Sequence, residues 1–414
     1  MTGAVLAACG GGTPAPTQPA ATSGATGAAS GNASGTLTVW GWEGIFASLK
    51  SQIEAFNQKY PNVTVDIKEF GYDDVHTNLL NAIVAGTGAP DLCGIDVLRL
   101  TQYVDGLTDL SEQATQYKDD FVRPTFALGS YQGKFYGLAG DSEPMGVYYR
   151  KDLWEQYGLK ADDITTWADL AADSQAFYTA SQEKVHLYAL NANDTGLYEV
   201  LAVEQGFPGY YFSTDDKRVI VDDPKIIEAV QALKLLWDAK GTLQNVNGGY
   251  TGDEMTALLK NGTVATQIIG PAWYAQTLIG NMPELSGKWQ VMRAPAVTKD
   301  GPRIGYQYPT IFVVPQQSAQ KDVAWELARM SLIGEGAKAG FEQDKTLPAY
   351  KPLLDELKSR PEPFFDNQKV YELWDQIAAD TPDVFFGSGF TEAQAILSTH
   401  LQAILTDQKT VDAG

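Results

Sequence analysis

The chain of 414 residues has few cysteines, few histidines and few positive charges. With 30 Lys and Arg against 51 Asp and Glu, its formal net charge is -21. This excludes a nucleic-acid partner, because phosphate binding needs clustered cations. No run of about 18 apolar residues occurs, so the body does not span a bilayer. His76, His186 and His400 have no neighbouring ligands at metal spacing, and the sequence has neither a Gly-x-Ser-x-Gly elbow nor a phosphate loop, so we expect no metal and no cofactor.

The first 35 residues are low in complexity and carry one chemical signal. The run Leu6–Cys9 resembles the lipobox of bacterial lipoproteins, whose cysteine is acylated; the alternative is a chance cysteine in a disordered tail. The basic segment that precedes a lipobox is missing, so we infer that the start is truncated or misassigned. We expect a signal remnant at 1–9 and a lipidated Cys9. Residues 10–35 contain only Gly, Ala, Ser, Thr, Pro, Asn and Gln, which predicts a disordered tether.

The remaining chain, about 380 residues, is longer than one hydrophobic core usually serves, so we expect two domains. Predicted strands alternate with helices that carry apolar residues at helical spacing, which indicates an α/β fold with a parallel sheet covered on both faces. A hairpin is predicted at 131–137. The other predicted strands lie at 36–40, 63–67, 92–95, 145–149, 185–190, 264–269, 289–294 and 310–314.

Eight short motifs follow one another along this body. They are Leu37–Trp40, Phe56–Pro61, Gly88–Leu92, Tyr131–Gly137, Tyr148–Leu153, Thr166–Leu170, Gly270–Trp273 and Leu347–Pro348. In this order they resemble the extracellular solute-binding proteins (family 1, maltose- and oligosaccharide-binding) of bacterial ABC importers. The resemblance implies a two-lobed periplasmic-binding-protein fold of type II, with the ligand cleft between discontinuous lobes. Lobe 1 is then expected at 36–140 and 295–345, and lobe 2 at 141–294 and 346–414.

The resemblance also implies a function. We expect a monomeric, exported protein at the cell surface or in the periplasm, held to the membrane only by its lipid anchor. It would capture a sugar or oligosaccharide by lobe closure and deliver it to the transmembrane subunits of an ABC permease. The alternatives are a non-sugar solute, such as a polyamine or glycerol phosphate, and a glycoside-processing enzyme. That enzyme needs two carboxyl groups about 5 to 9 Å apart, whereas we expect the side chains of Asp141 and Glu143 to point away from each other.

Aromatic residues are the first candidates for the binding site. A sugar presents hydroxyl groups and flat C–H faces, so its site combines polar groups with exposed rings in loops at the carboxyl ends of strands. Trp42 and Trp273 each follow a predicted strand, and we predict that they contact ligand. Trp237, Trp325 and Trp374 lie in amphipathic helices and are expected in the core.

Polar candidates complete the predicted site. Glu43 and Asp96 can each contact ligand or cap the next helix, and both interpretations stay open. Position within the family favours Glu143 over Asp141 as a ligand-contacting carboxylate. The further predicted ligand contacts are Asp194, Tyr306, Gln307 and Phe390.

Overall fold

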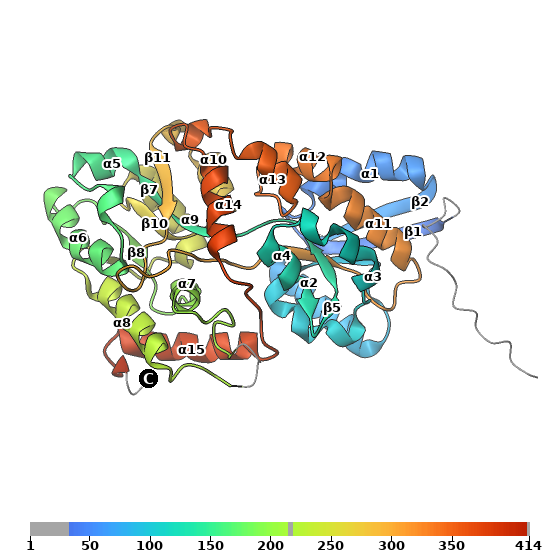
Figure 1. The fold of residues 1–414 in the computed structure, drawn as a ribbon, viewed down its shortest axis with the longest axis horizontal. Helices are drawn as coiled ribbons and strands as arrows, with labels where there is room; N and C mark the ends of the chain where they lie inside the picture. Colours follow the sequence, from blue (N-terminus) through green and yellow to red (C-terminus); the bar gives the residue numbers. More distant parts are fainter. Residues whose placement is uncertain (1–32, 214–217, 412–414) are drawn as a thin grey trace, which may run out of the picture.

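The computed structural model describes residues 33–213 and 218–411, which form two α/β lobes side by side (Figure 1). The predicted Cys9 anchor and nearly all of the predicted tether lie outside these residues. The first strand, β1, begins at Ser34, slightly earlier than predicted. Within the described ranges, no helix is both long enough and apolar enough to cross a lipid bilayer.

A five-stranded sheet in the order β2-β1-β3-β12-β6 forms the centre of lobe 1. Its first three strands are parallel, as predicted. β12 runs antiparallel to both β3 and β6, and so inserts a late segment of the chain into the sheet. The bounds are β1 (Ser34–Trp42), β2 (Asn62–Phe70), β3 (Leu92–Asp96), β6 (Gly137–Ala139) and β12 (Thr310–Val313).

Helices cover both faces of this sheet (Figure 1). Buried residues at helical spacing, such as Leu49 and Phe56 in α1 and Val75 and Leu79 in α2, hold the helices against the sheet. α1 (Ala47–Lys59) packs against α11 (Lys321–Leu332) and α12 (Glu335–Asp344). The other face carries α2 (Tyr72–Ala85), α3 (Ser111–Ala114) and α4 (Arg123–Leu128), and the predicted hairpin is β4 (Ser130–Tyr131) with β5 (Lys134–Phe135).

Lobe 2 contains the antiparallel sheet β10-β7-β11, made of β7 (Met145–Arg150), β10 (Thr266–Pro271) and β11 (Trp289–Arg293). The strand predicted at 185–190 is wrong for most of its length. Only β8 (Ala189–Leu190) is a strand, paired in parallel with β9 (Leu243–Gln244). The helices are α5 (Lys151–Gln156), α6 (Trp167–Ala180), α7 (Gly196–Glu204), α8 (Pro224–Asp238), α9 (Asp253–Asn261), α10 (Tyr274–Asn281), α13 (Lys351–Leu357), α14 (Val370–Asp380) and α15 (Phe390–Leu405).

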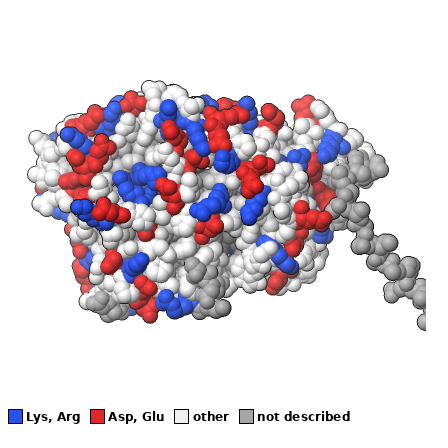
Figure 2. All heavy atoms as spheres, viewed as in Figure 1, with Lys and Arg blue, Asp and Glu red and all other residues white. Residues whose placement is uncertain are grey.

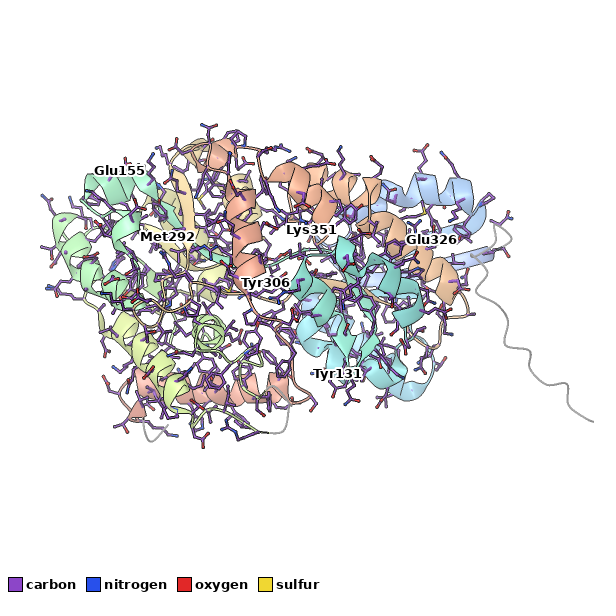
Figure 3. All side chains as sticks on the ribbon, in the orientation of Figure 1. Tyr131, Glu155, Met292, Tyr306, Glu326 and Lys351 are labelled. Atoms are coloured by element: carbon purple, nitrogen blue, oxygen red, sulfur yellow. The ribbon has the colours of Figure 1, made fainter. Side chains whose placement is uncertain are left out.

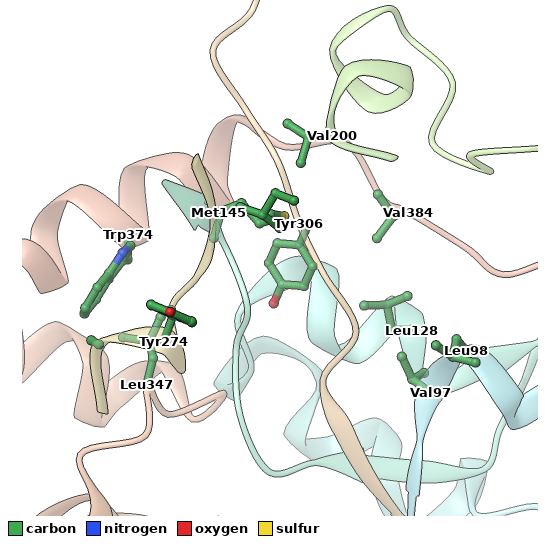
Figure 4. Close-up of a cluster of buried hydrophobic side chains, with 14 of the residues drawn as sticks. Val97, Leu98, Leu128, Met145, Val200, Tyr274, Tyr306, Leu347, Trp374 and Val384 are labelled. Carbon is green, nitrogen blue, oxygen red and sulfur yellow. The ribbon is translucent and has the colours of Figure 1, made fainter. Parts of the chain in front are cut away.

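Large aromatic side chains are central to the core. Trp237, Trp325 and Trp374 are buried, which confirms the prediction from helical periodicity. Tyr306 is also buried, in a cluster of apolar side chains where the two lobes meet (Figures 3 and 4). The core therefore includes the region between the lobes.

In the part of the chain that the structure describes, three irregular segments, 140–144, 294–309 and 345–350, connect elements of the two lobes. They pair with one another. The amide of Ser142 donates to the carbonyl oxygen of Leu347 at 2.9 Å, and the amide of Gln307 donates to that of Glu143 at 2.9 Å. Each segment contains or adjoins a predicted lobe boundary, and we retain those boundaries as a proposed division of the chain.

Candidate functional site

A cavity of about 660 Å³ lies between the lobes, beside the crossing segments. Both lobes contribute side chains to its wall, and none of the described residues that line it is a lysine or an arginine. The residues with aromatic or hydrogen-bonding side chains in the wall include Trp42, Glu43, Tyr72 and Asp96 from lobe 1, Asp141, Gln307 and Tyr308 from the crossings, and Tyr250, Thr251, Trp273 and Gln276 from lobe 2.

The lobe 1 wall is aromatic. Trp42 ends β1 and Tyr72 begins α2, so both stand at the carboxyl ends of parallel strands. Their ring centroids are 5.2 Å apart in an edge-to-face arrangement, and the ring of His76 lies 5.5 Å from that of Trp42. Glu43 is exposed in the same turn. This wall offers partly exposed rings of the kind on which a sugar stacks.

Asp96 is the last residue of β3, and the structure supports both interpretations that the sequence left open. Its Oδ1 accepts the amide hydrogen of Leu98 at 3.1 Å, which caps a short 3-10 helix, Val97–Gln102. Its Oδ2 accepts the hydroxyl hydrogen of Tyr72 at 2.8 Å, and the residue lines the cavity as well. Burial raises the pKa of this carboxyl to about 7. Asp96 therefore positions Tyr72 and still borders the space where a ligand would lie.

Tyr250 reaches the cavity from a glycine-rich loop of lobe 2. Gly248 has a φ of 76°, and a Cβ there would lie 2.9 Å from the Cα of Gly252, so the loop needs glycine. The carbonyl oxygen of Tyr250 accepts a hydrogen bond from Gln267 Nε2 at 2.9 Å. Its hydroxyl accepts one from Gln307 Nε2 at 3.3 Å. These bonds fix the ring between lobe 2 and a crossing segment.

Trp273 stands on the lobe 2 wall, after β10 and at the first position before α10. Its main-chain amide donates to Glu143 Oε2 at 3.1 Å. Glu143 itself is fully buried, so the prediction that its carboxylate contacts ligand is wrong in this structure. Asp141, two residues earlier, lines the cavity instead.

The profile of the family described as bacterial extracellular solute-binding protein matches residues 40–332. The chain belongs to this family. This chain is 24% identical to the arabinooligosaccharide-binding protein of Bacillus subtilis over an alignment of 392 residues, which covers 90% of this chain and 88% of the relative. It is also 24% identical to the lactose-binding protein of Rhizobium radiobacter, covering 90% and 89%. Membership in an extracellular family makes it an exported binding protein.

Solved structures show the same fold. The ABC transporter-associated binding protein of B. animalis subsp. lactis, solved with beta-1,6-galactobiose, superimposes with a TM-score of 0.75 at 22% identity, covering 92% of this chain and 95% of that one. MalE of Xanthomonas citri gives a TM-score of 0.75 at 15% identity, covering 91% and 94%. The predicted two-lobed periplasmic-binding-protein fold is confirmed.

The carboxyl groups of Asp141 and Glu143 are immediate neighbours, and Asp141 raises the pKa of Glu143, so the expectation that the two side chains point apart is wrong. Residues two apart in an extended segment lie on the same face. Ser142 points the other way, and its Oγ lies 2.9 Å from the hydroxyl of Tyr306. Tyr306 is 1% exposed and does not line the cavity, which contradicts its predicted place at the cleft edge.

Phe390 is also buried rather than exposed to the cleft, because it packs in an aromatic cluster with Tyr211 and Phe386, at ring centroid distances of 4.8 Å from each. Asp194 borders an adjoining cavity of about 420 Å³ that shares Tyr72 and Tyr250 with the main one. Its Oδ1 accepts the amide hydrogen of Gly196 at 2.8 Å, and burial raises its pKa to about 6.

Two prominent cavity residues were missed from the sequence, Tyr72 and Tyr250. Tyr72 directly follows β2 and Gly71, so the rule that selected Trp42 also selects it. Tyr250 stands in a Gly-Gly-Tyr-Thr-Gly run, whose glycines are the only local signal of a loop that brings a ring close to other backbone.

Proposed function

We propose that the binding protein captures a neutral sugar or oligosaccharide and delivers it to the membrane subunits of an ABC importer. The observation that carries this proposal is the cavity wall, in which Trp42 and Trp273 come from different lobes and polar side chains lie between them. Indole faces suit the C–H faces of a sugar, and Asp141, Gln307 and Glu43 offer hydrogen-bonding groups for its hydroxyls. The printed names of the relatives, arabinooligosaccharide- and lactose-binding, support the same ligand class.

Lobe closure is the mechanism we propose. The cavity takes its wall from both lobes, and the three paired crossings are the segments about which the lobes can rotate. A ligand touches both walls in the closed form and one wall in the open form. Binding then shifts the population towards closure, and the permease recognises the closed shape.

We propose that no bond of the ligand is broken. The carboxyl groups of Asp141 and Glu143 are immediate neighbours, with Asp141 raising the pKa of Glu143, whereas the two carboxyls of a glycosidase stand about 5 Å or more apart across the substrate. Glu143 is also fully buried and out of reach of a substrate. The test is incubation of the protein with oligosaccharides, followed by an assay for new reducing ends.

We propose Trp42, Glu43, Asp96, Asp194, Trp273 and Gln307 as ligand contacts, with Asp141, Tyr72 and Tyr250 added from the cavity wall. Attachment to the membrane through Cys9 and the tether belongs to the same proposal. On the face seen in Figure 2, Lys and Arg side chains are scattered among Asp and Glu, which fits an anchor of lipid rather than a basic surface.

The alternative solutes are not favoured. A glycerol phosphate site needs cationic clamps, and none of the described residues lining the main cavity supplies one. A thermal-shift screen tests the sugar proposal directly. Arabino-oligosaccharides, lactose and galactobiose should raise the unfolding midpoint with concentration, since a ligand that binds only the folded state stabilises it. A shift with spermidine or glycerol phosphate, and none with any sugar, contradicts the proposal.

A further inference from the structure

Glu143 is a buried acid with an incomplete set of hydrogen-bond partners. Its Oε2 accepts the amide hydrogen of Trp273 at 3.1 Å. Its Oε1 is also buried and has no hydrogen-bond partner among the described residues, although the backbone of Ala272, beside that of Trp273, acts to lower the pKa of this carboxyl. The neighbour of its carboxyl is the side chain of Asp141, which is another acid.

Asp141 is held from the opposite side. Its Oδ1 accepts the amide hydrogen of Thr310 at 2.8 Å, at the start of β12 in lobe 1. The two neighbouring carboxyl groups therefore connect the lobes. Asp141 accepts a backbone hydrogen bond from lobe 1, and Glu143 accepts one from Trp273 of lobe 2. Two ionised carboxylates in such contact repel each other strongly, and a shared proton removes that repulsion.

Among the described residues, no Lys or Arg is one of the main influences on the pKa of either carboxyl. The described charged and titratable groups that act most strongly on the pair are acids and phenols: Asp344 at the end of α12, Asp96 at the end of β3, Tyr148 in β7 and Tyr306 in the second crossing. Burial and the neighbouring Asp141 raise the pKa of Glu143 well above its usual range. Burial raises the pKa of Asp141 to about 6.

We propose that Glu143 carries a proton on Oε1 at neutral pH, donates it in a hydrogen bond to Asp141, and so acts as a positioning residue for Trp273 in the ligand cleft. The buried Oε1 then has a partner, and the series Thr310–Asp141–Glu143–Trp273 is complete from one lobe to the other. The role in ligand binding rests on the proposed sugar-binding function, whereas the protonation itself does not.

The first experiment asks where the proton is. The C=O stretch of protonated carboxyl groups is measured by infrared difference spectroscopy at neutral pH on wild type, Glu143→Gln and Glu43→Gln. We expect Glu143→Gln to lose part of the protonated-carboxyl band and Glu43→Gln, an exposed acid in the cleft, to keep it. An unchanged band in Glu143→Gln overturns the proposal, whether or not any sugar binds.

The second experiment asks what the proton does. A glutamine amide can donate to Asp141 and still accept from the Trp273 amide, whereas alanine can do neither. We expect Glu143→Gln to keep the sugar Kd within about twofold of wild type, and Glu143→Ala to raise it about tenfold, because the alanine leaves the Trp273 amide unpartnered.

Equal losses in the glutamine and alanine variants overturn the proposal, since they indicate that a negative charge at Glu143 is required. Binding at wild-type strength by the alanine variant also overturns it, because Trp273 is then positioned without Glu143. Should wild type bind no sugar at all, the proposed function fails, and the infrared measurement still decides the protonation of Glu143.

Discussion

His76 Nε2 accepts a hydrogen bond of 3.0 Å from the main-chain amide of Asp96, while its Nδ1 lies 2.7 Å from the carbonyl oxygen of Tyr72. This pair of contacts assigns the proton to Nδ1, because an amide can only donate and a carbonyl can only accept. The imidazole thus joins the end of β3 to the start of α2, directly behind the ring of Trp42. Burial lowers the pKa of His76 to about 4.

Acid should therefore weaken the fold through His76. The unfolded chain takes up a proton near pH 6.5, and the folded chain only near pH 4, so stability contributed above pH 6.5 is lost as the pH falls towards 4. Relative to His76→Gln, the free energy of unfolding of wild type should fall by up to about 3 kcal/mol across this window. Denaturant titrations of both proteins at several pH values measure it; parallel curves contradict the prediction.

Asp194 should give the opposite pH dependence. Its pKa rises from 3.8 in the unfolded chain to about 6 in the folded one, so the folded state binds the proton more tightly and loses stability as the pH rises through this range. We expect Asp194→Asn to gain about 2 kcal/mol over wild type between pH 4 and pH 7. Asp253→Asn, an exposed acid at the start of α9, is the control and should not change this difference.

Removal of either cleft indole should weaken sugar binding. Trp42→Ala and Trp273→Ala each lose a stacking surface, which costs about 1 to 3 kcal/mol, or roughly 5- to 150-fold in Kd. Trp40→Ala is a matched control, since Trp40 lies in the same strand as Trp42, packs on Phe70 and lines none of the cavities described above. Fluorescence or calorimetric titrations compare the three variants, and a larger loss in Trp40→Ala than in the other two contradicts the assignment.

Ligand should make the molecule more compact. Closure about the three crossings brings the lobes together, so the radius of gyration in small-angle X-ray scattering should decrease on saturation with a sugar that raises the unfolding midpoint. Trp273→Ala at the same sugar concentration should stay closer to the unliganded radius. An unchanged radius in wild type at saturation contradicts lobe closure.

Local patterns predicted the elements that have a clear periodicity. Trp237 and Trp374 were predicted in the core because helical spacing exposes one face of a helix and buries the other, and they are buried. Trp42 was predicted to contact ligand because the end of a parallel strand can be recognised from the local sequence. The structure places it in the cavity wall. The strand predicted at 185–190 was too long, since before Ala189 the chain forms only an isolated bridge, from His186 to Val264.

The burial of Glu143, Tyr306 and Phe390 escaped prediction because it depends on distant segments. Glu143, Tyr306 and Phe390 stand in irregular or terminal positions, and each is buried by residues more than a hundred positions away, such as Trp273 against Glu143 and Ser142 against Tyr306. No periodicity reports such contacts. The sequence alone could place these residues near the cleft, but it could not show whether their side chains face the cavity or the buried core.

The insertion of β12 between β3 and β6 sets the order in which lobe 1 can fold. Until residue 313 has been synthesised, the sheet stays in two pieces, because its joining strand does not yet exist. Such non-local pairing delays folding, since a long loop must close before the contacts form. A chain whose tertiary structure forms late stays unfolded for longer and can pass through a narrow channel in that state. This favours an exported protein, which completes its fold after it has crossed the membrane.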